Sequence, residues 1–201
     1  MADPLYPSVR QSAGNTRAFM EHVEHHAVEL RRRAGVGPTD RLDPRTLTTE
    51  LRIHIVTLDD IRDLSAEDRA HLAAVDARVW SGAGMSLPDG YTLVILHPNQ
   101  TDERAAATIM EEVCHAYFGH KPSQLITLPG GIVKRAYHPE AEREAYWTAA
   151  AALLPAQVVA KAVWRGTARE LVTEYRVSIE LVEFRVKTLR LWQEYQRSDI
   201  A

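Results

Sequence analysis

The sequence contains a single cysteine, Cys114, and therefore cannot form an internal disulfide bond. Its N-terminal stretch, MADPLYPSVRQSAGNTR, lacks the apolar segment of a secretory signal peptide. Together these two absences predict a cytoplasmic protein, because thiols stay reduced in that compartment. Long apolar runs are also missing, since the longest, TAAAALLPAQVVAKAVW, is interrupted by Pro155 and Lys161. That run is too short to span a bilayer, and two buried helices are the better interpretation.

A strong excess of charge of one sign is absent as well. The chain has 24 basic and 27 acidic residues, which leave a formal net charge of -3. Such a chain has no broad cationic field for nucleic acid or for an anionic membrane. We therefore expect neither a membrane nor direct nucleic acid among its partners.

The chain does contain enough apolar residues for a proper core, with 45% hydrophobic content over 201 residues. Residues 1–15 contain prolines, serines and a glycine without periodicity, and they are predicted to form a flexible tail. Residues 16–155 are predicted to form the main domain. Residues 156–201 are predicted to form a helical extension packed on that domain.

Helical periodicity and strand alternation both occur along the chain. Alternation predicts strands at residues 52–57 and 91–96, the second after a turn at Pro88-Asp89-Gly90, and a hairpin across Gly130 and Gly131. Helices are predicted at residues 16–34, after Pro44, after an N-capping Ser65, at 102–118, at 139–154, from Pro155, and as a C-terminal pair divided near Ser178.

The stretch TIMEEVCHAYFGH, residues 108–120, contains a candidate metal site. Zinc peptidases of the zincin type place two histidines one helical turn apart, with a glutamate directly after the first. Here Glu111 occupies the first position, Glu112 follows it, and His115 lies one turn further on. Ligands at i and i+4 can bind one ion, and the adjacent glutamate can take a proton from water. A third ligand can come from the acidic helix that follows, which offers Glu140, Glu142 and Glu144.

The stretches HAYFGH and EAYWTAAAALLP extend this pattern. They resemble the ImmA/IrrE family of metallopeptidases, whose active helix begins His-Glu-x-x-His and often ends in Gly-His. The family's next helix carries Glu-Ala-Asn-x-Phe-Ala-x-x-Leu-Leu-x-Pro, which residues 144–155 follow in register. The resemblance covers about residues 16 to 192. It implies an α+β, zincin-like fold with a small, partly antiparallel sheet, an active-site helix and a helical C-terminal half.

The same resemblance implies a role for individual residues. His115 would be a metal ligand, Glu112 the general base, and Glu142 the third ligand, with Glu144 as the competing choice. Glu111, which replaces the family's first histidine, is expected to bind the ion through its carboxylate. The implied function is an intracellular metal-dependent peptidase with an altered ligand set.

The replacement of a histidine by Glu111 changes the expected chemistry of the ion. A Glu-His-Glu set has two negative charges where the two-histidine set has one, so the ion is a weaker Lewis acid. Oxygen ligands shift the preference toward manganese or iron(II), although zinc remains our first expectation for the single divalent ion. A second departure is Tyr146, which replaces the asparagine that supports a ligand from one turn away.

The resemblance also implies a protein or peptide substrate, in this family commonly a helix-turn-helix repressor linked to mobile elements or to stress response. YTLVIL, residues 91–96, is expected to be an edge strand beside the cleft, where an extended peptide could add as a further strand. Tyr137 and His138, just before the acidic helix, are further candidates for substrate contacts.

The remaining histidines and the cysteine are assigned structural roles. We expect His22, His25 and His26 to lie on a solvated helix face. His120 is expected to point away from His115 and to stabilise the negative end of the active helix. Cys114 is expected to be a buried, small apolar residue.

Three rival interpretations belong to other classes. Glu112 and His115 also form the Glu-x-x-His of carboxylate-bridged four-helix bundles, but that motif does not recur and the strands oppose an all-helical fold. The C-terminal helix pair resembles a helix-turn-helix with Arg185, Lys187 and Arg190 on its second helix, yet that helix is apolar nearly all round. The third is a catalytically inactive scaffold that binds a protein partner, which the presence of a bound metal would distinguish from an enzyme.

Overall fold

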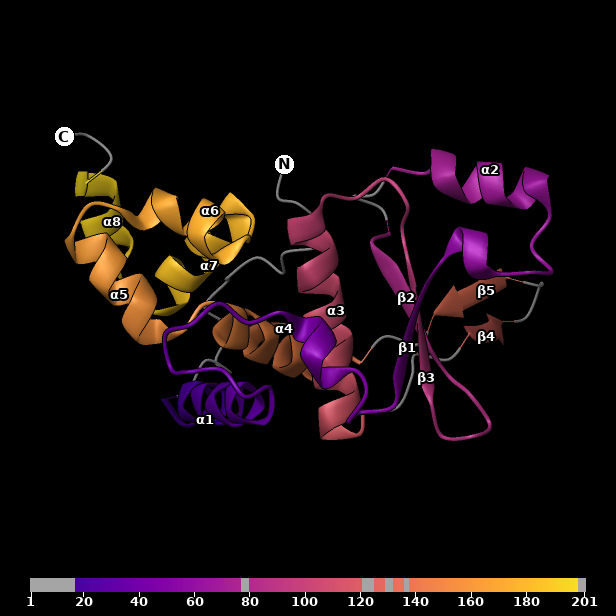
Figure 1. The fold of residues 1–201 in the computed structure, drawn as a ribbon, viewed down its shortest axis with the longest axis horizontal. Coiled ribbons are helices and arrows are strands. Elements are labelled where there is room, and N and C mark those ends of the chain that lie inside the picture. Colours follow the sequence, from indigo (N-terminus) through magenta and orange to yellow (C-terminus); the bar gives the residue numbers. More distant parts are fainter. Residues whose placement is uncertain (1–16, 77–79, 121–124, 129–131, 136–137, 199–201) are drawn as a thin grey trace.

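The computed structural model describes residues 17–76, 80–120, 125–128, 132–135 and 138–198. These residues form a mixed α+β fold, as predicted (Figure 1). The helices are α1 (Arg17–Arg33), α2 (Ala66–Ala74), α3 (Asp102–Phe118), α4 (Pro139–Leu153), α5 (Ala156–Trp164), α6 (Leu171–Tyr175), α7 (Ile179–Thr188) and α8 (Trp192–Ser198). The strands are β1 (Ile53–Thr57), β2 (Gly82–Ser86), β3 (Thr92–Leu96), β4 (Leu125–Leu128) and β5 (Ile132–Arg135), and the short 3-10 helices are η1 (Pro44–Leu47), η2 (Leu58–Asp60) and η3 (Ala168–Glu170).

Most predicted elements are present, including the helix at 102–118 and the strands at 53–57 and 92–96. The predicted hairpin is confirmed, because β4 and β5 pair antiparallel with Leu128 opposite Ile132. None of the described helices has both the length and the apolar composition needed to cross a bilayer. The strands also exclude the four-helix carboxylate bundle.

Strands β1, β3 and β2 form one sheet in that order. β1 runs parallel to β3, with Ile55 opposite Val94, and β2 runs antiparallel to β3, with Gly84 opposite Val94. Our prediction that residues 91–96 form an edge strand is therefore wrong, because β3 lies in the middle of the sheet. Within the described residues the edge strands of this sheet are β1 and β2. The sequence of β2, GAGMS, has little strand propensity and was not predicted as a strand.

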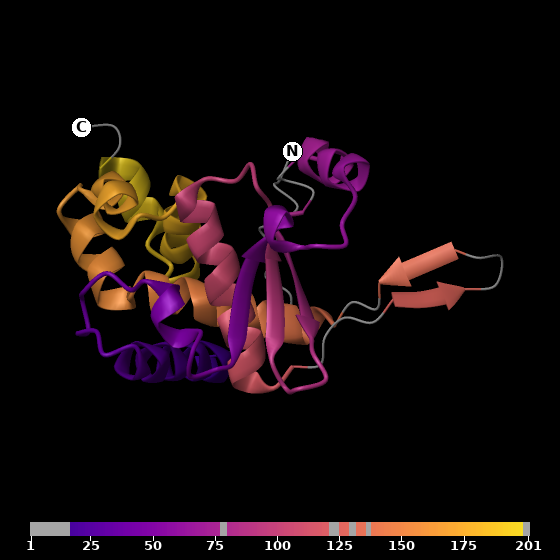
Figure 2. The same ribbon diagram turned by 45° about the vertical axis from the view of Figure 1, so that its right-hand side comes forward.

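Helix α3 lies between this sheet and α4, as Figures 1 and 2 both show. It begins after Thr101, whose side chain accepts a hydrogen bond from the backbone N–H of Arg104. It ends at Gly119, which has a φ of 66° in the left-handed region that glycine adopts without strain. These two caps fix where the helix begins and ends.

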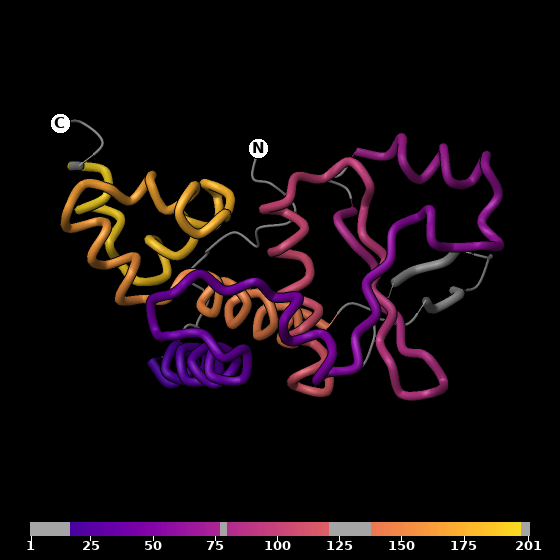
Figure 3. Tube along the Cα trace, viewed as in Figure 1, coloured from indigo at the N-terminus to yellow at the C-terminus, as the bar shows by residue number. Residues whose placement is uncertain are grey.

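Helix α4 is the most enclosed element of the described chain. It begins with Pro139 in its first turn, and residues 145–153 are all buried. Helices α3 and α1 both pack against α4 (Figure 3), and its four consecutive alanines, residues 149–152, are all buried. A helix that is apolar all round belongs in the interior, and this position brings the polar first turn of α4 next to α3.

The C-terminal helices pack together at the end of the molecule opposite the sheet (Figures 1 and 2). Ser178 caps α7 by accepting a hydrogen bond from the N–H of Leu181, as predicted. Helix α7 contacts α4, α5 and α8, and its Arg185 is fully buried. A buried Arg185 cannot reach a base edge, so the helix pair packs within the fold.

Candidate metal centre

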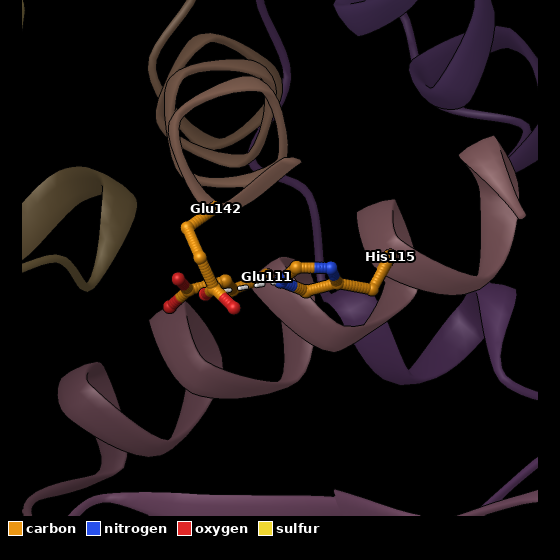
Figure 4. Close-up of side chains that lie close together, drawn as sticks. All are labelled: Glu111, His115 and Glu142. Atoms are coloured by element: carbon orange, nitrogen blue, oxygen red, sulfur yellow. Dashed lines mark ion pairs between the residues drawn. The ribbon is translucent and has the colours of Figure 1, made fainter. Parts of the chain in front are cut away.

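Glu111 and His115 of α3 and Glu142 of α4 point toward one another (Figure 4). Each residue offers one ligand atom, and these atoms all lie within 4.8 Å of one another. His115 Nε2 lies 3.5 Å from Glu142 Oε2, and the side chains of both are about one-fifth exposed (20% and 21%). The three residues named by sequence reasoning as metal ligands thus come together at a partly exposed position.

The local sequence explains this convergence. Glu111 and His115 are four residues apart, and therefore lie one above the other on the same side of α3. Glu142 lies in the first turn of α4, where the positive end of the helix dipole stabilises a carboxylate. Helices α3 and α4 pack against each other, and this contact brings Glu142 next to Glu111 and His115.

The site has a negative electrostatic environment. Burial lowers the pKa of the His115 imidazole, but the adjacent Glu142 and the charges of Glu112 and Glu111 raise it by more. The pKa of His115 therefore lies above its ordinary value. The same carboxylates that stabilise a proton on His115 would stabilise a bound metal cation.

Glu112 lies against β2, an edge strand of the sheet. A Cβ atom added to Gly84 would lie 2.3 Å from Oε2 and 2.9 Å from Cδ of Glu112. At Gly82, two residues earlier on the same face of β2, an added Cβ atom would lie 2.7 Å from Thr108 Cγ2. These two glycines let α3 pack directly against β2, and they place the proposed general base beside the backbone of that strand. Two glycines spaced two residues apart are a sequence signal for such close packing, and our sequence analysis did not use it.

A second group of polar side chains begins at the other ring nitrogen of His115, Nδ1. His115 Nδ1 is 3.0 Å from His120 Nδ1, and His120 Nε2 is 2.8 Å from Glu144 Oε2. The other oxygen of that carboxylate, Oε1, is 2.6 Å from His22 Nε2 on α1. Our expectation that His120 points away from His115 is therefore wrong.

The prediction of a solvated face for the α1 histidines holds only for His25. His22 and His26 are both partly buried, and His26 Nδ1 lies 2.9 Å from the Tyr117 hydroxyl. Sequence reasoning considered only partners on the same helical turn, whereas the partner of His22 is 122 positions away. No local pattern in the sequence reveals such a contact.

The remaining candidates lie as follows. Glu144, the alternative metal ligand, has its carboxylate between His120 and His22. Burial raises the pKa of Glu144, but the hydrogen bonds and charges of His120 and His22 together lower it by more, so the pKa lies below its ordinary value. His138 is exposed and occupies the N-cap position of α4. Tyr137 lies outside the described residues. Cys114 is buried as predicted.

The donor set fits a divalent ion. Three protein ligands are the usual contribution to a hydrolytic site, which keeps one coordination position for water or substrate; here they are one imidazole nitrogen and two carboxylates. Among the described residues, Glu111, His115 and Glu142 are the group whose ligand atoms are mutually close enough to share an ion. His22, His120 and Glu144 do not meet that condition, because their contacts form a chain and do not converge on one point.

A comparison with known protein families matches residues 63–187 to the IrrE N-terminal-like domain, Peptidase_M78. The match covers more than half of the chain and includes both helices that carry the candidate site. No curated protein matches the chain, and neither does any solved structure.

Proposed function

The chain belongs to the IrrE N-terminal-like peptidase family, and from that premise we propose that it is a metal-dependent peptidase whose ion is bound by Glu111, His115 and Glu142. The observation that carries the proposal is the convergence of one imidazole and two carboxylates from two different helices. Carboxylates that face one another repel, so a cation between them is the simplest reason for the arrangement. Zinc is the first candidate, and the oxygen-rich ligand set also suits manganese and iron(II).

A bound divalent ion would supply Lewis-acid polarisation of a substrate carbonyl and would acidify a water molecule. The chain's own contribution is to hold and move the proton. Glu112 follows the ligand Glu111 directly, and its charge helps to raise the pKa of His115, so we assign its carboxylate to accept the proton of the attacking water. The same carboxylate can then return a proton to the leaving amine.

The edge strand β2 gives the site a place for an extended peptide. Within the described residues β2 pairs only with β3, so its other edge has backbone groups available for a further strand. Strand addition there would carry a peptide bond past Gly84, which lies against the Glu112 carboxylate. This replaces our earlier assignment of residues 91–96 to that role. A helix-turn-helix repressor is the protein substrate that the family resemblance suggests.

The test is cleavage of a peptide library by untagged protein supplied with zinc, manganese or iron(II). We expect cleavage by the wild-type protein with at least one ion. Glu112→Gln keeps all three ligands and should retain the ion, but it should lose about 100-fold or more of the cleavage rate because general-base catalysis is removed. Wild-type protein that binds an ion and cleaves no peptide would refute the peptidase assignment and favour a binding scaffold.

A further inference from the structure

The contacts from His115 to His120 and on to Glu144 limit how their protons can be arranged. The Glu144 carboxylate accepts hydrogen bonds and cannot donate them, so His120 carries a proton on the Nε2 atom that lies 2.8 Å from Glu144 Oε2. The other nitrogen of His120, Nδ1, lies 3.0 Å from His115 Nδ1. When His115 Nε2 binds an ion, the proton of His115 is on Nδ1 and is donated to His120 Nδ1, so the hydrogen bonds run in one direction from His115 through His120 to Glu144.

Nε2 of His115 is on the side of the ring that faces Glu142 and Glu111. A metal ion binds a neutral imidazole through the lone pair of one nitrogen, and the hydrogen bond at the other nitrogen sets which tautomer is present. Hydrogen bonds that run from His115 Nδ1 through His120 to Glu144 therefore favour the tautomer that metal binding requires.

Several contacts hold His120 and Glu144 in place. The His120 ring stacks on Phe118 with 5.4 Å between ring centroids, and its side chain is only 12% exposed. His22 also stacks on Phe118, and it contacts the second oxygen of Glu144 at 2.6 Å. Three elements, α1, the end of α3 and α4, therefore meet around one carboxylate.

We propose that His120 and Glu144 are positioning residues, which hold His115 in the Nδ1-protonated tautomer with Nε2 directed at the ion site. The inference rests on the proposed function only in assigning His115 as a metal ligand. It gives His120 a role that neither the ligand set nor the general base includes, and it separates Glu144 from Glu142: one orients a ligand and the other binds the ion.

The first experiment locates the protons in the zinc-loaded protein. In ¹⁵N-resolved NMR spectra, His120 should be protonated on Nε2 alone, so that its Nδ1 accepts the Nδ1 proton of His115 and its Nε2–H is donated to Glu144. A His120 ring that carries a proton on Nδ1 cannot accept from His115 and would overturn the proposal.

The second experiment measures affinity for zinc in competition with a chromophoric chelator. His120→Phe should weaken binding by about 10- to 100-fold, the usual effect of removing a partner of a ligating histidine. His120→Gln, whose amide can accept from His115 and donate to Glu144, should recover most of the loss. His25→Gln, on the exposed face of α1, is the control and should bind as the wild type does.

The two experiments separate the two hypotheses. Wild-type protein that takes up no metal contradicts the proposed function. Wild-type protein that binds zinc with His120 protonated on Nδ1 contradicts the positioning role alone. Equal loss of affinity in His120→Phe and His120→Gln would show that His120 is itself a ligand or only a packing residue, and would refute the hydrogen-bond role.

Discussion

Removal of the carboxylate of Glu24 should lower the free energy of unfolding more than the loss of a surface ion pair does. Glu24 Oε1 lies 2.7 Å from Arg185 Nη2, and the Arg185 side chain is only 1% exposed. Arg185 Nε also donates to the carbonyl oxygen of Leu154 at 2.9 Å. A single guanidinium thus joins α7 to α1 and to the C-terminal end of α4. Glu142 lies in the first turn of the same helix.

The magnitude follows from burial. Burial lowers the pKa of Arg185, and the charge of Glu24 opposes that shift. Breaking a buried pair by removing one partner costs about 3–5 kcal/mol. Glu24 is 31% exposed, so we expect Glu24→Ala to fall near the lower end, about 3 kcal/mol. Arg185→Met should cost about 1–3 kcal/mol, because it leaves the buried Leu154 carbonyl without this donor.

Urea denaturation of the two single variants and the double variant tests the reasoning. The double variant should lose less free energy of unfolding than the sum of the single losses, by about 1 kcal/mol or more, since neither charge is then left alone. The control is Glu21→Ala, which breaks the exposed pair with Arg17 and should leave stability unchanged. A loss below about 1 kcal/mol for Glu24→Ala, or additive losses, would refute the importance of the buried charge.

Two further predictions concern α3. Gly82→Ala should lower the free energy of unfolding by about 1–3 kcal/mol, because the new methyl group meets the stiff, buried Thr108 and approaches the carbonyl oxygen of Ile95 to 3.2 Å. Gly84→Ala displaces only the flexible end of Glu112, so urea denaturation should show a smaller loss; the reverse order would contradict the packing described. Cys114 is buried, and burial raises the pKa of its thiol, so a thiol reagent should react with it only after denaturant is added, whereas rapid reaction of the native protein would contradict the burial.

The sequence predicts where the helices and strands of this fold lie better than it predicts which elements lie next to one another. Helix α3 has strong local signals at both ends, Thr101 and Gly119, and its bounds are as predicted. Strand β2 has no such signal, because its glycines are there for close packing against α3 and weaken its strand propensity. Without β2, the strand at 91–96 was wrongly placed at the edge of the sheet.

The candidate site also contains some residues whose roles the sequence predicts and others whose roles it does not. Glu111 and His115 follow from helical spacing alone, and Glu142 follows from the family resemblance; the structure brings all three together. The roles of His120 and His22 depend on contacts with Glu144 on another helix, and helical spacing within one element contains no information on them.

Metal stoichiometry of purified, untagged protein tests the central claim most directly. After incubation with zinc, manganese or iron(II) and removal of excess ion, we expect close to one ion per chain for the wild type. The same should hold for Glu140→Ala, which removes an exposed carboxylate from the same turn of α4 as Glu142. Bound ion should fall sharply in each of three variants: Glu111→Ala, His115→Ala and Glu142→Ala. Wild-type protein that retains none of the three ions, or ligand variants that retain as much as Glu140→Ala, would contradict the assigned site.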